Sequence, residues 1–374
     1  MRMLFMTISL LAGGSALAAA PAQAAKAPSP EQLSAFLKHY PAADANRDGL
    51  LSAEEAQDYR RIKMAARRPA EPNKASAPTH ANLKYGPYES NVLDLWVSPS
   101  NRPSPLIVFI HGGGFVGGDK SQAQPRAVEG CLAAGVSYAT INYRFRDRAA
   151  IQDILRDAAR AVQFLRLHAS EYGLDPQRVA CYGGSAGAGT SLWLATRDDL
   201  ADPKSDEPVL RQSTRLSAAA CLNGQATYDL TQWETLIGPF RKEWKSDPDE
   251  DAKFYHFSSQ ADLQTDAAKR VLAECDMLRW ISKDDPPLFM SCTQPDGEPA
   301  NRNQYVHHPR HAKAVKAQCD QAGEPCEIAL SSGNGEEAAV RFLLRNLLEK
   351  NRAPIRTETA PAGHARLSYS AKRS

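Results

Sequence analysis

RVACYGGSAGAG, residues 178–189, is the stretch that decides the fold. Its first half is an apolar run typical of a buried strand, and a helix-compatible segment follows as far as Ala195. Between the two, Gly183–Gly187 matches the pattern G-x-S-x-G, in which a serine occupies a tight strand-to-helix turn. Such a turn exposes the Ser185 hydroxyl and aims the amide of Ala186 at a developing oxyanion. The alternative interpretation is a glycine-rich turn with an idle serine, and this motif alone is weak.

A second glycine-rich motif lies upstream. Leu106–Ile110 is another buried-strand pattern, and it runs into a histidine, Gly112, Gly113, Gly114 and a phenylalanine. Three consecutive glycines after a strand leave backbone amides free to point into a site and bind an oxyanion. The two motifs therefore predict one site at the carboxyl end of a sheet.

With the two motifs in this order along the chain, the sequence resembles the α/β-hydrolase superfamily. It is most similar to the bacterial esterase/lipase branch, which is related to hormone-sensitive lipase and feruloyl esterase. The likeness covers roughly residues 83–350. It implies an ester hydrolase with Ser185 as the nucleophile. It also implies an oxyanion hole formed by the amides of Gly113, Gly114 and Ala186.

Strand and helix patterns alternate through the same region, which indicates an α/β fold with a mostly parallel sheet covered on both faces. Residues 225–282 interrupt the alternation with large aromatic residues, among them Trp233, Phe240, Trp244, Phe254, Tyr255 and Trp280. The resemblance implies a helical insertion over the site, and the alternative is that these aromatics pack a small core of their own. We expect strands over residues 92–97, 105–111, 137–144, 178–184, 216–222, 286–292 and 326–330, and helices over 153–171 and 336–350.

The resemblance also implies a carboxylate after the strand at residues 287–292 and a histidine after the last strand. Asp296 lies close to the first place, with Glu298 as a second candidate. Asn334 occupies the second place, and an amide cannot act as a general base because it takes up no proton near neutral pH. Asn334 can instead cap the final helix, with Glu337 three residues later.

Two histidines could supply the missing base. His307 and His308 end the long loop that begins at Asp296, on the side of the sheet that carries the serine. His308 precedes Pro309, which favours a helix cap for this residue, so we select His307 as the base. His364 lies in the C-terminal tail, where no fixed geometry is expected. The function is then an exported serine esterase for small or carbohydrate-linked esters. The alternative is a non-catalytic binding or scaffolding protein that keeps the elbow as inherited structure.

The N-terminal region predicts a signal peptide and a calcium site. Residues 1–24 have a basic start, a short apolar run and an Ala-Gln-Ala cleavage site, which indicates export to the periplasm or medium. Residues 29–65 contain a single EF-hand, opened by a capping box at Ser29 and Gln32. The alternative for this segment is an acidic turn between two helices. The predicted Ca²⁺ ligands are Asp44, Asn46, Asp48, the carbonyl of Leu50, Ser52 and Glu55, with Gly49 at the sharp turn.

The remaining sequence sets the domain limits and the partners. Residues 66–82 form a linker, 83–351 the hydrolase domain, and 352–374 a tail predicted to be disordered. A net charge of +2 gives no electrostatic footprint for nucleic acid, so a small-molecule ester is the expected partner. The N-terminal apolar run is too short to favour stable membrane insertion. Seven cysteines leave at least one unpaired, and Cys319 with Cys326 form the favoured disulfide.

Overall fold

The computed structural model describes residues 29–39, 43–44, 49–52, 56, 77–100, 102–245, 247–330 and 335–349. The chain divides into two units, Met1–Ala56 and Gln57–Ser374, and each is considered by itself. The signal peptide, the tail, most of the linker and Asn334 lie outside the described residues, so export and the role of Asn334 stay predictions. Among the residues described, no helix is both long and apolar enough to cross a bilayer.

An eight-stranded sheet forms the centre of the second unit, in the order β1-β2-β4-β3-β5-β6-β7-β8. β2 runs antiparallel to both neighbours, and every other pair is parallel, which confirms the predicted α/β class. β1 was not expected, because its residues show little apolar character and only partial burial. The strands are β1 (His80–Lys84), β2 (Val92–Trp96), β3 (Ser104–Ile110), β4 (Ser137–Ile141), β5 (Leu174–Gly184), β6 (Ala218–Leu222), β7 (Leu288–Cys292) and β8 (Cys326–Leu330).

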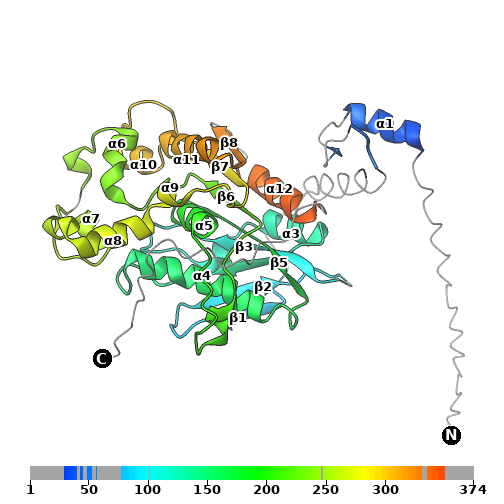
Figure 1. Ribbon diagram of the computed structural model, residues 1–374, viewed down its shortest axis with the longest axis horizontal. Coiled ribbons are helices and arrows are strands. Elements are labelled where there is room, and N and C mark those ends of the chain that lie inside the picture. Colours follow the sequence, from blue (N-terminus) through cyan, green and yellow to red (C-terminus); the bar gives the residue numbers. More distant parts are fainter. Residues whose placement is uncertain are drawn as a thin grey trace, which may run out of the picture. The chain divides into compact units, whose positions relative to one another are not determined.

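Helices cover both faces of this sheet (Figure 1). Because strand side chains alternate between faces, β3 sends Val108 and Ile110 into one core and Ile107 and Phe109 into the other. The first core is shared with α4 (Ile151–Leu167), α5 (Ala186–Thr196) and α11 (Pro309–Ala322), and the second with α3 (Pro125–Ala133) and α12 (Gly335–Leu348).

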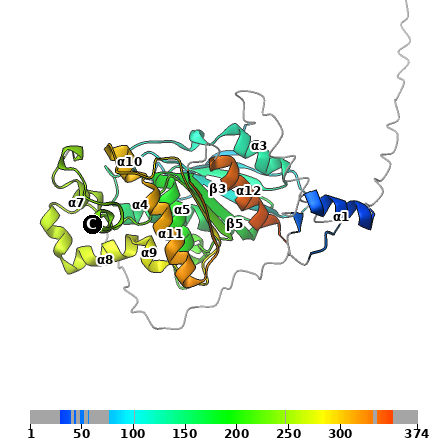
Figure 2. The same ribbon diagram turned by 90° about the horizontal axis from the view of Figure 1, so that it is seen from above.

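The insertion after β6 consists of short helices, and α7 and α8 lie at one end of the unit (Figure 2). The aromatic residues of the insertion form two groups with different surroundings. Phe254 and Tyr255 are buried in the main core, whereas Trp233, Phe240 and Trp244 surround Tyr305 of α10. The short helices are η4 (Leu230–Gln232), α6 (Trp233–Ile237), η5 (Lys242–Trp244), α7 (Glu250–Phe254), η6 (Gln260–Gln264), α8 (Asp266–Cys275) and α9 (Met277–Trp280), followed after β7 by α10 (Arg302–Val306). Two further turns outside the insertion are η2 (Lys120–Gln122) and η3 (Pro208–Arg211).

The predicted capping box at the start of α1 (Pro30–His39) is confirmed. The backbone N–H of Ser29 donates to Gln32 Oε1 at 2.9 Å, and the N–H of Gln32 donates to Ser29 Oγ at 3.3 Å. Together these bonds satisfy two amides that the first turn of a helix leaves without partners.

The predicted disulfide is not formed. All seven cysteines are buried free thiols. Contact between the two side chains and burial raise the pKa of the Cys319 thiol, so Cys319 and Cys326 are neighbours that remain unbonded. The spacing in sequence therefore identified the neighbours correctly but not their chemical state.

Candidate active site

Ser185 stands on a strained turn between β5 and α5. Its backbone has φ 51° and ψ −117°, a positive φ that few non-glycine residues adopt. The turn passes very close to the end of β3, where a Cβ on Gly183 would lie 2.2 Å from the carbonyl oxygen of Ile110. A Cβ on Gly187 would lie 1.9 Å from the same atom. The glycines of the motif are therefore required by close backbone contact, and the turn holds the serine at the sheet's carboxyl end.

The glycine loop after β3 borders the same place. The Tyr143 hydroxyl donates to the carbonyl of His111 at 2.6 Å, and the two rings stack with centroids 4.2 Å apart. Beyond this anchor the chain turns through Gly113 and Gly114, whose φ angles are 109° and 61°. Their N–H groups, like that of Ala186, donate no hydrogen bond to any residue that the structure describes. These amides remain available to an oxyanion.

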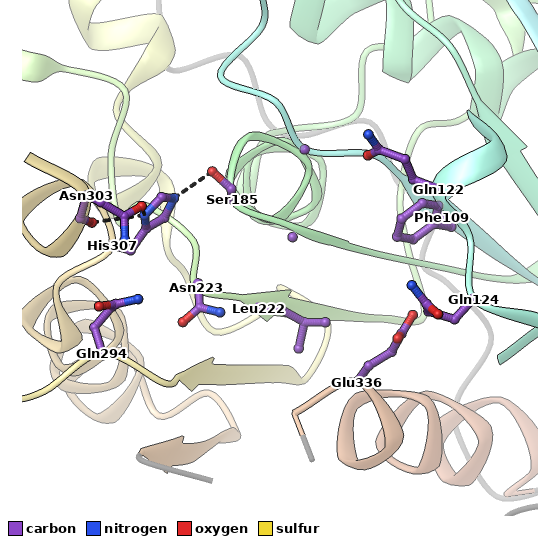
Figure 3. Close-up of a pocket in the computed structure, with 12 residues that line it drawn as sticks. Phe109, Gln122, Gln124, Ser185, Leu222, Asn223, Gln294, Asn303, His307 and Glu336 are labelled. Carbon is purple, nitrogen blue, oxygen red and sulfur yellow. Dashed lines mark hydrogen bonds between the residues drawn. The ribbon is translucent and has the colours of Figure 1, made fainter. Parts of the chain in front are cut away.

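His307 meets Ser185. Its Nε2 lies 2.7 Å from the serine Oγ (Figure 3). The other ring nitrogen, Nδ1, lies 3.0 Å from the carbonyl oxygen of Asn303 and 3.1 Å from the Oδ1 of the same residue. Because a carbonyl oxygen can only accept, the ring proton is assigned to Nδ1, and Nε2 keeps a lone pair for the serine hydroxyl. This is the geometry that a nucleophile and its base require.

Burial changes the pKa of His307. Desolvation lowers the pKa of His307 from its ordinary value of 6.5, while the hydrogen bond to the Asn303 backbone opposes this shift in part. The imidazole is consequently neutral near pH 7 and able to accept a proton.

Helix α10 carries His307 at its C-terminal end and is held on several sides. The Tyr305 hydroxyl donates to the carbonyl of Gly238 at 3.1 Å, and the Gln225 side chain donates to the carbonyl of Val306 at 3.0 Å. The Cys292 thiol donates to the carbonyl of His307 at 3.0 Å. Residues of the insertion thus fix the helix that presents the imidazole.

The structure does not bring Asp296 to His307. Its exposed carboxylate pairs with Lys313, which lowers the pKa of Asp296, and the second candidate, Glu298, pairs with Arg241 at 3.1 Å. Asn303 holds the imidazole instead. Asn303 could have been found from its spacing, because a residue four positions before His307 lies on the same face of a helix.

His308 is the cap of α11, as its position before Pro309 predicted. Its Nδ1 accepts from the N–H of Arg310 at 3.2 Å, and its Nε2 donates to the carbonyl of Gly297 at 2.7 Å. With both nitrogens engaged, His308 has no free atom for the serine.

Replacing Asp296 by asparagine is therefore expected to change kcat/KM by less than about twofold. Only an exposed ion pair with Lys313 is lost, and such pairs contribute about 0–1 kcal/mol. Steady-state kinetics on an aryl acetate measures the effect. A loss of about a hundredfold would restore Asp296 as the acid of the site.

An open pocket of about 670 Å³ surrounds the Ser185–His307 pair. Ser185, His307 and Asn303 lie on one side, and Phe109, Gln122, Gln124 and Glu336 lie across from them (Figure 3). Between the two sides are Leu222 and Asn223. The pocket has room for a small ester with a group of several atoms beyond its carbonyl.

Part of the predicted calcium loop is described in the first unit. Asp44 Oδ2 accepts a hydrogen bond from the N–H of Gly49 at 2.9 Å, and Gly49 has φ 80°. Asp44 Oδ1 is buried and accepts no hydrogen bond from a residue that the structure describes. Asn46, Asp48 and Glu55 lie outside the described residues, and no cluster of three ligands occurs among those that are described. Ca²⁺ binding by this loop therefore stays a prediction.

Several known proteins are similar to part of this chain. A family model described as BD-FAE matches residues 93–299. The probable carboxylic ester hydrolase LipM of Mycobacterium tuberculosis is 32% identical over 163 residues, 42% of this chain and 37% of LipM. The probable isoprenylcysteine alpha-carbonyl methylesterase ICMEL1 of Arabidopsis thaliana is 25% identical over 194 residues, 51% of this chain and 40% of that protein. The match spans about two fifths of the length of these relatives.

Solved structures share the fold. A truncated form of a carbohydrate esterase from gut microbiota has a TM-score of 0.58 at 17% identity, over 74% of this chain and 99% of that chain. An acetyl ester-xyloside bifunctional hydrolase from Caldicellulosiruptor lactoaceticus has a TM-score of 0.53 at 18% identity, over 73% of this chain and 97% of that chain. At these identities the likeness concerns the fold alone, and it confirms the predicted α/β-hydrolase fold.

Proposed function

The chain belongs to the BD-FAE family, and from this and the site geometry we infer that it is a serine hydrolase of carboxylic esters. We propose Ser185 as the nucleophile, His307 as the general base and Asn303 as the residue that orients the base. The proposed substrates are small or carbohydrate-linked esters. The observation that carries the proposal is the 2.7 Å contact between Ser185 Oγ and His307 Nε2.

The reaction proceeds in two halves. Ser185 Oγ attacks the ester carbonyl carbon while His307 Nε2 takes the hydroxyl proton, and the amides of Gly113, Gly114 and Ala186 bind the oxyanion that forms. The tetrahedral intermediate collapses, and the alcohol leaves with the proton from His307. Water then gives its proton to His307 and attacks the acyl-enzyme, which releases the carboxylic acid and returns the proton to Ser185.

The competing function is a non-catalytic binding protein. Turnover of p-nitrophenyl acetate by the purified protein, compared with Ser185→Ala, separates the two. Activity that disappears in the variant supports the hydrolase, whereas equal background rates in both proteins would favour the binding protein.

Asn303→Asp is expected to raise kcat/KM at pH 8 by about tenfold or more, because a carboxylate stabilises the imidazolium formed in the transition state better than an amide does. The pH profile carries a second signature. In the wild type the neutral base predominates above the lowered pKa of His307, so the acid limb of the activity profile lies below the ordinary histidine pKa of 6.5. A carboxylate beside the ring raises that pKa, and the acid limb moves to higher pH.

Asn301→Asp is the matched control. Asn301 caps α10 through its side chain, a role that aspartate fills equally well, and it adds the same charge without contacting His307. We expect the Asn301→Asp variant to keep nearly the wild-type rate on the plateau of the pH profile. An unshifted acid limb in Asn303→Asp would contradict the assigned role of Asn303.

For the first unit we propose weak Ca²⁺ binding, near the millimolar affinity of extracellular EF-hands. The bidentate ligand is Glu55, so Glu55→Gln is expected to weaken binding about tenfold or more, while the neighbouring Glu54→Gln leaves it unchanged. Calorimetric titration of the full chain measures both. No heat at several millimolar Ca²⁺ in the wild type would show that the loop does not bind the ion.

A further inference from the structure

The side of the pocket opposite His307 is polar but carries no cation. Of the residues that line the pocket, five have side-chain amides and one, Glu336, has a carboxylate, while none is lysine or arginine. We name Gln122, Gln124 and Glu336 the polar wall. They come from η2, the N-cap of α3 and the first turn of α12, and they face the serine across Leu222 (Figure 3).

Glu336 is an anchored acceptor. Its Oε1 accepts a hydrogen bond from the Tyr182 hydroxyl at 3.0 Å, and the Tyr182 and Tyr138 hydroxyls lie 2.6 Å apart in the core. Burial holds the pKa of both tyrosines well above their ordinary value, so both stay neutral. The other carboxylate oxygen of Glu336 receives no hydrogen bond from any described residue. One oxygen is therefore fixed, and the other is free to bind a ligand.

The two glutamines supply both donors and acceptors. Gln122 and Gln124 are exposed, and their side-chain amides make no hydrogen bond within the described part of the chain. Gln124 is the N-cap of α3 without a capping hydrogen bond from its side chain. Neither amide is used to hold the fold.

Apolar surface adjoins this wall. Phe109 lies beside Gln122 and Gln124, and Leu222 lies between the polar wall and Ser185. A ring with C–H groups on its face and hydroxyl groups at its edge matches this combination, because its face packs on carbon while its edge bonds to amides and carboxylate. A hydrocarbon leaves the polar wall without partners, and an anion is repelled by Glu336.

We propose that the polar wall binds the hydroxyl groups of a neutral polyol, so that the enzyme selects esters in which the group beyond the scissile bond is polyhydroxylated. This inference rests on the proposed ester hydrolysis at Ser185. It adds Glu336, with Gln122 and Gln124, as the residues that determine specificity.

A matched pair of substrates tests the selection. Glucose 6-acetate and cyclohexylmethyl acetate each carry an acetyl group on a CH₂O attached to a six-membered ring, and they differ chiefly in the hydroxyls and the ring oxygen. We expect the wild type to prefer the first by about tenfold or more in kcat/KM, as expected for a site that recognises hydroxyl groups. p-Nitrophenyl acetate reports the serine and histidine independently of the wall.

Glu336→Leu and Gln124→Leu are the test variants, and each is expected to reduce the preference to about threefold or less. Gln124→Leu removes no helix cap, so it remains informative if Glu336→Leu folds poorly. The control is Glu337→Gln, the next residue of α12, which among the described residues pairs with Arg341 on the surface. It should keep the wild-type preference.

Three outcomes are distinguishable. A preference that is lost in both test variants and kept in Glu337→Gln supports the polar wall. Equal wild-type rates on the matched pair, or a preference unchanged in both variants, overturns this inference alone. No hydrolysis of any ester by the wild type overturns the proposed function and the inference with it.

Discussion

Replacing His307 by alanine is expected to lower kcat by about a hundredfold or more, with KM changed little. The imidazole is the group in contact with the Ser185 hydroxyl, and loss of a general base costs on the order of 10²–10⁴ in rate. Ser185→Ala should cost at least as much. The double variant should be no worse than the poorer single variant, because residues that act as one unit are not additive.

His168→Ala is the control for a histidine change alone. His168 ends α4 and contacts the exposed side chain of Glu171, away from the pocket. Its rate should stay within about twofold of the wild type, as is usual for surface changes. If His307→Ala were equally active, another group would have to deprotonate the serine, and the assignment of His307 would be wrong.

Gly187→Ala is expected to destabilise the second unit by about 3 kcal/mol and to lower Tm by roughly 6–12 °C. The new Cβ would stand 1.9 Å from the carbonyl oxygen of Ile110, and backbone cannot yield as a flexible side chain does. The elbow must then move away from β3. A displacement near 1 Å at the nucleophile costs about a hundredfold in rate, so activity should fall as well.

Gly297→Ala is the matched control, because no atom lies within 4 Å of the position of its Cβ and its φ is not positive. Differential scanning calorimetry of both variants measures the difference. A Gly187→Ala protein with wild-type Tm would show that the turn and β3 are less closely packed than the structure indicates.

Most of the fold could be predicted because its local patterns agree with its packing. The continuous apolar runs at β3 and β5 are buried on both faces, which is the pattern that parallel strands require. β1 was missed because an edge strand with partial burial needs no such pattern. The sequence also did not show which aromatic residues of the insertion enter the main core and which contact α10. Those contacts involve a helix that follows the insertion in the chain.

Features of the site that depend on residues adjacent in the sequence could be predicted better than features that depend on distant contacts. Ser185 and the glycines depend on neighbouring backbone, and the sequence identified them directly. His307 was selected over His308 and His364 by its place in the loop after Asp296, and the structure brings it to the serine. Asp296 was selected by its place in the chain, but Lys313 holds it at the surface. Asn303 was overlooked because an amide is an unusual partner for a base, although its spacing from His307 placed it on the same helix face.

The central claim is that His307 activates Ser185, and labelling with a fluorophosphonate tests it most directly. The purified wild-type protein, Ser185→Ala and His307→Ala are treated alike beside a control esterase, and adducts are mapped by mass spectrometry. We predict an adduct on Ser185 in the wild type, none in Ser185→Ala, and labelling slowed by about a hundredfold or more in His307→Ala. An unlabelled Ser185 in the wild type, while the control esterase labels fully, would contradict the account.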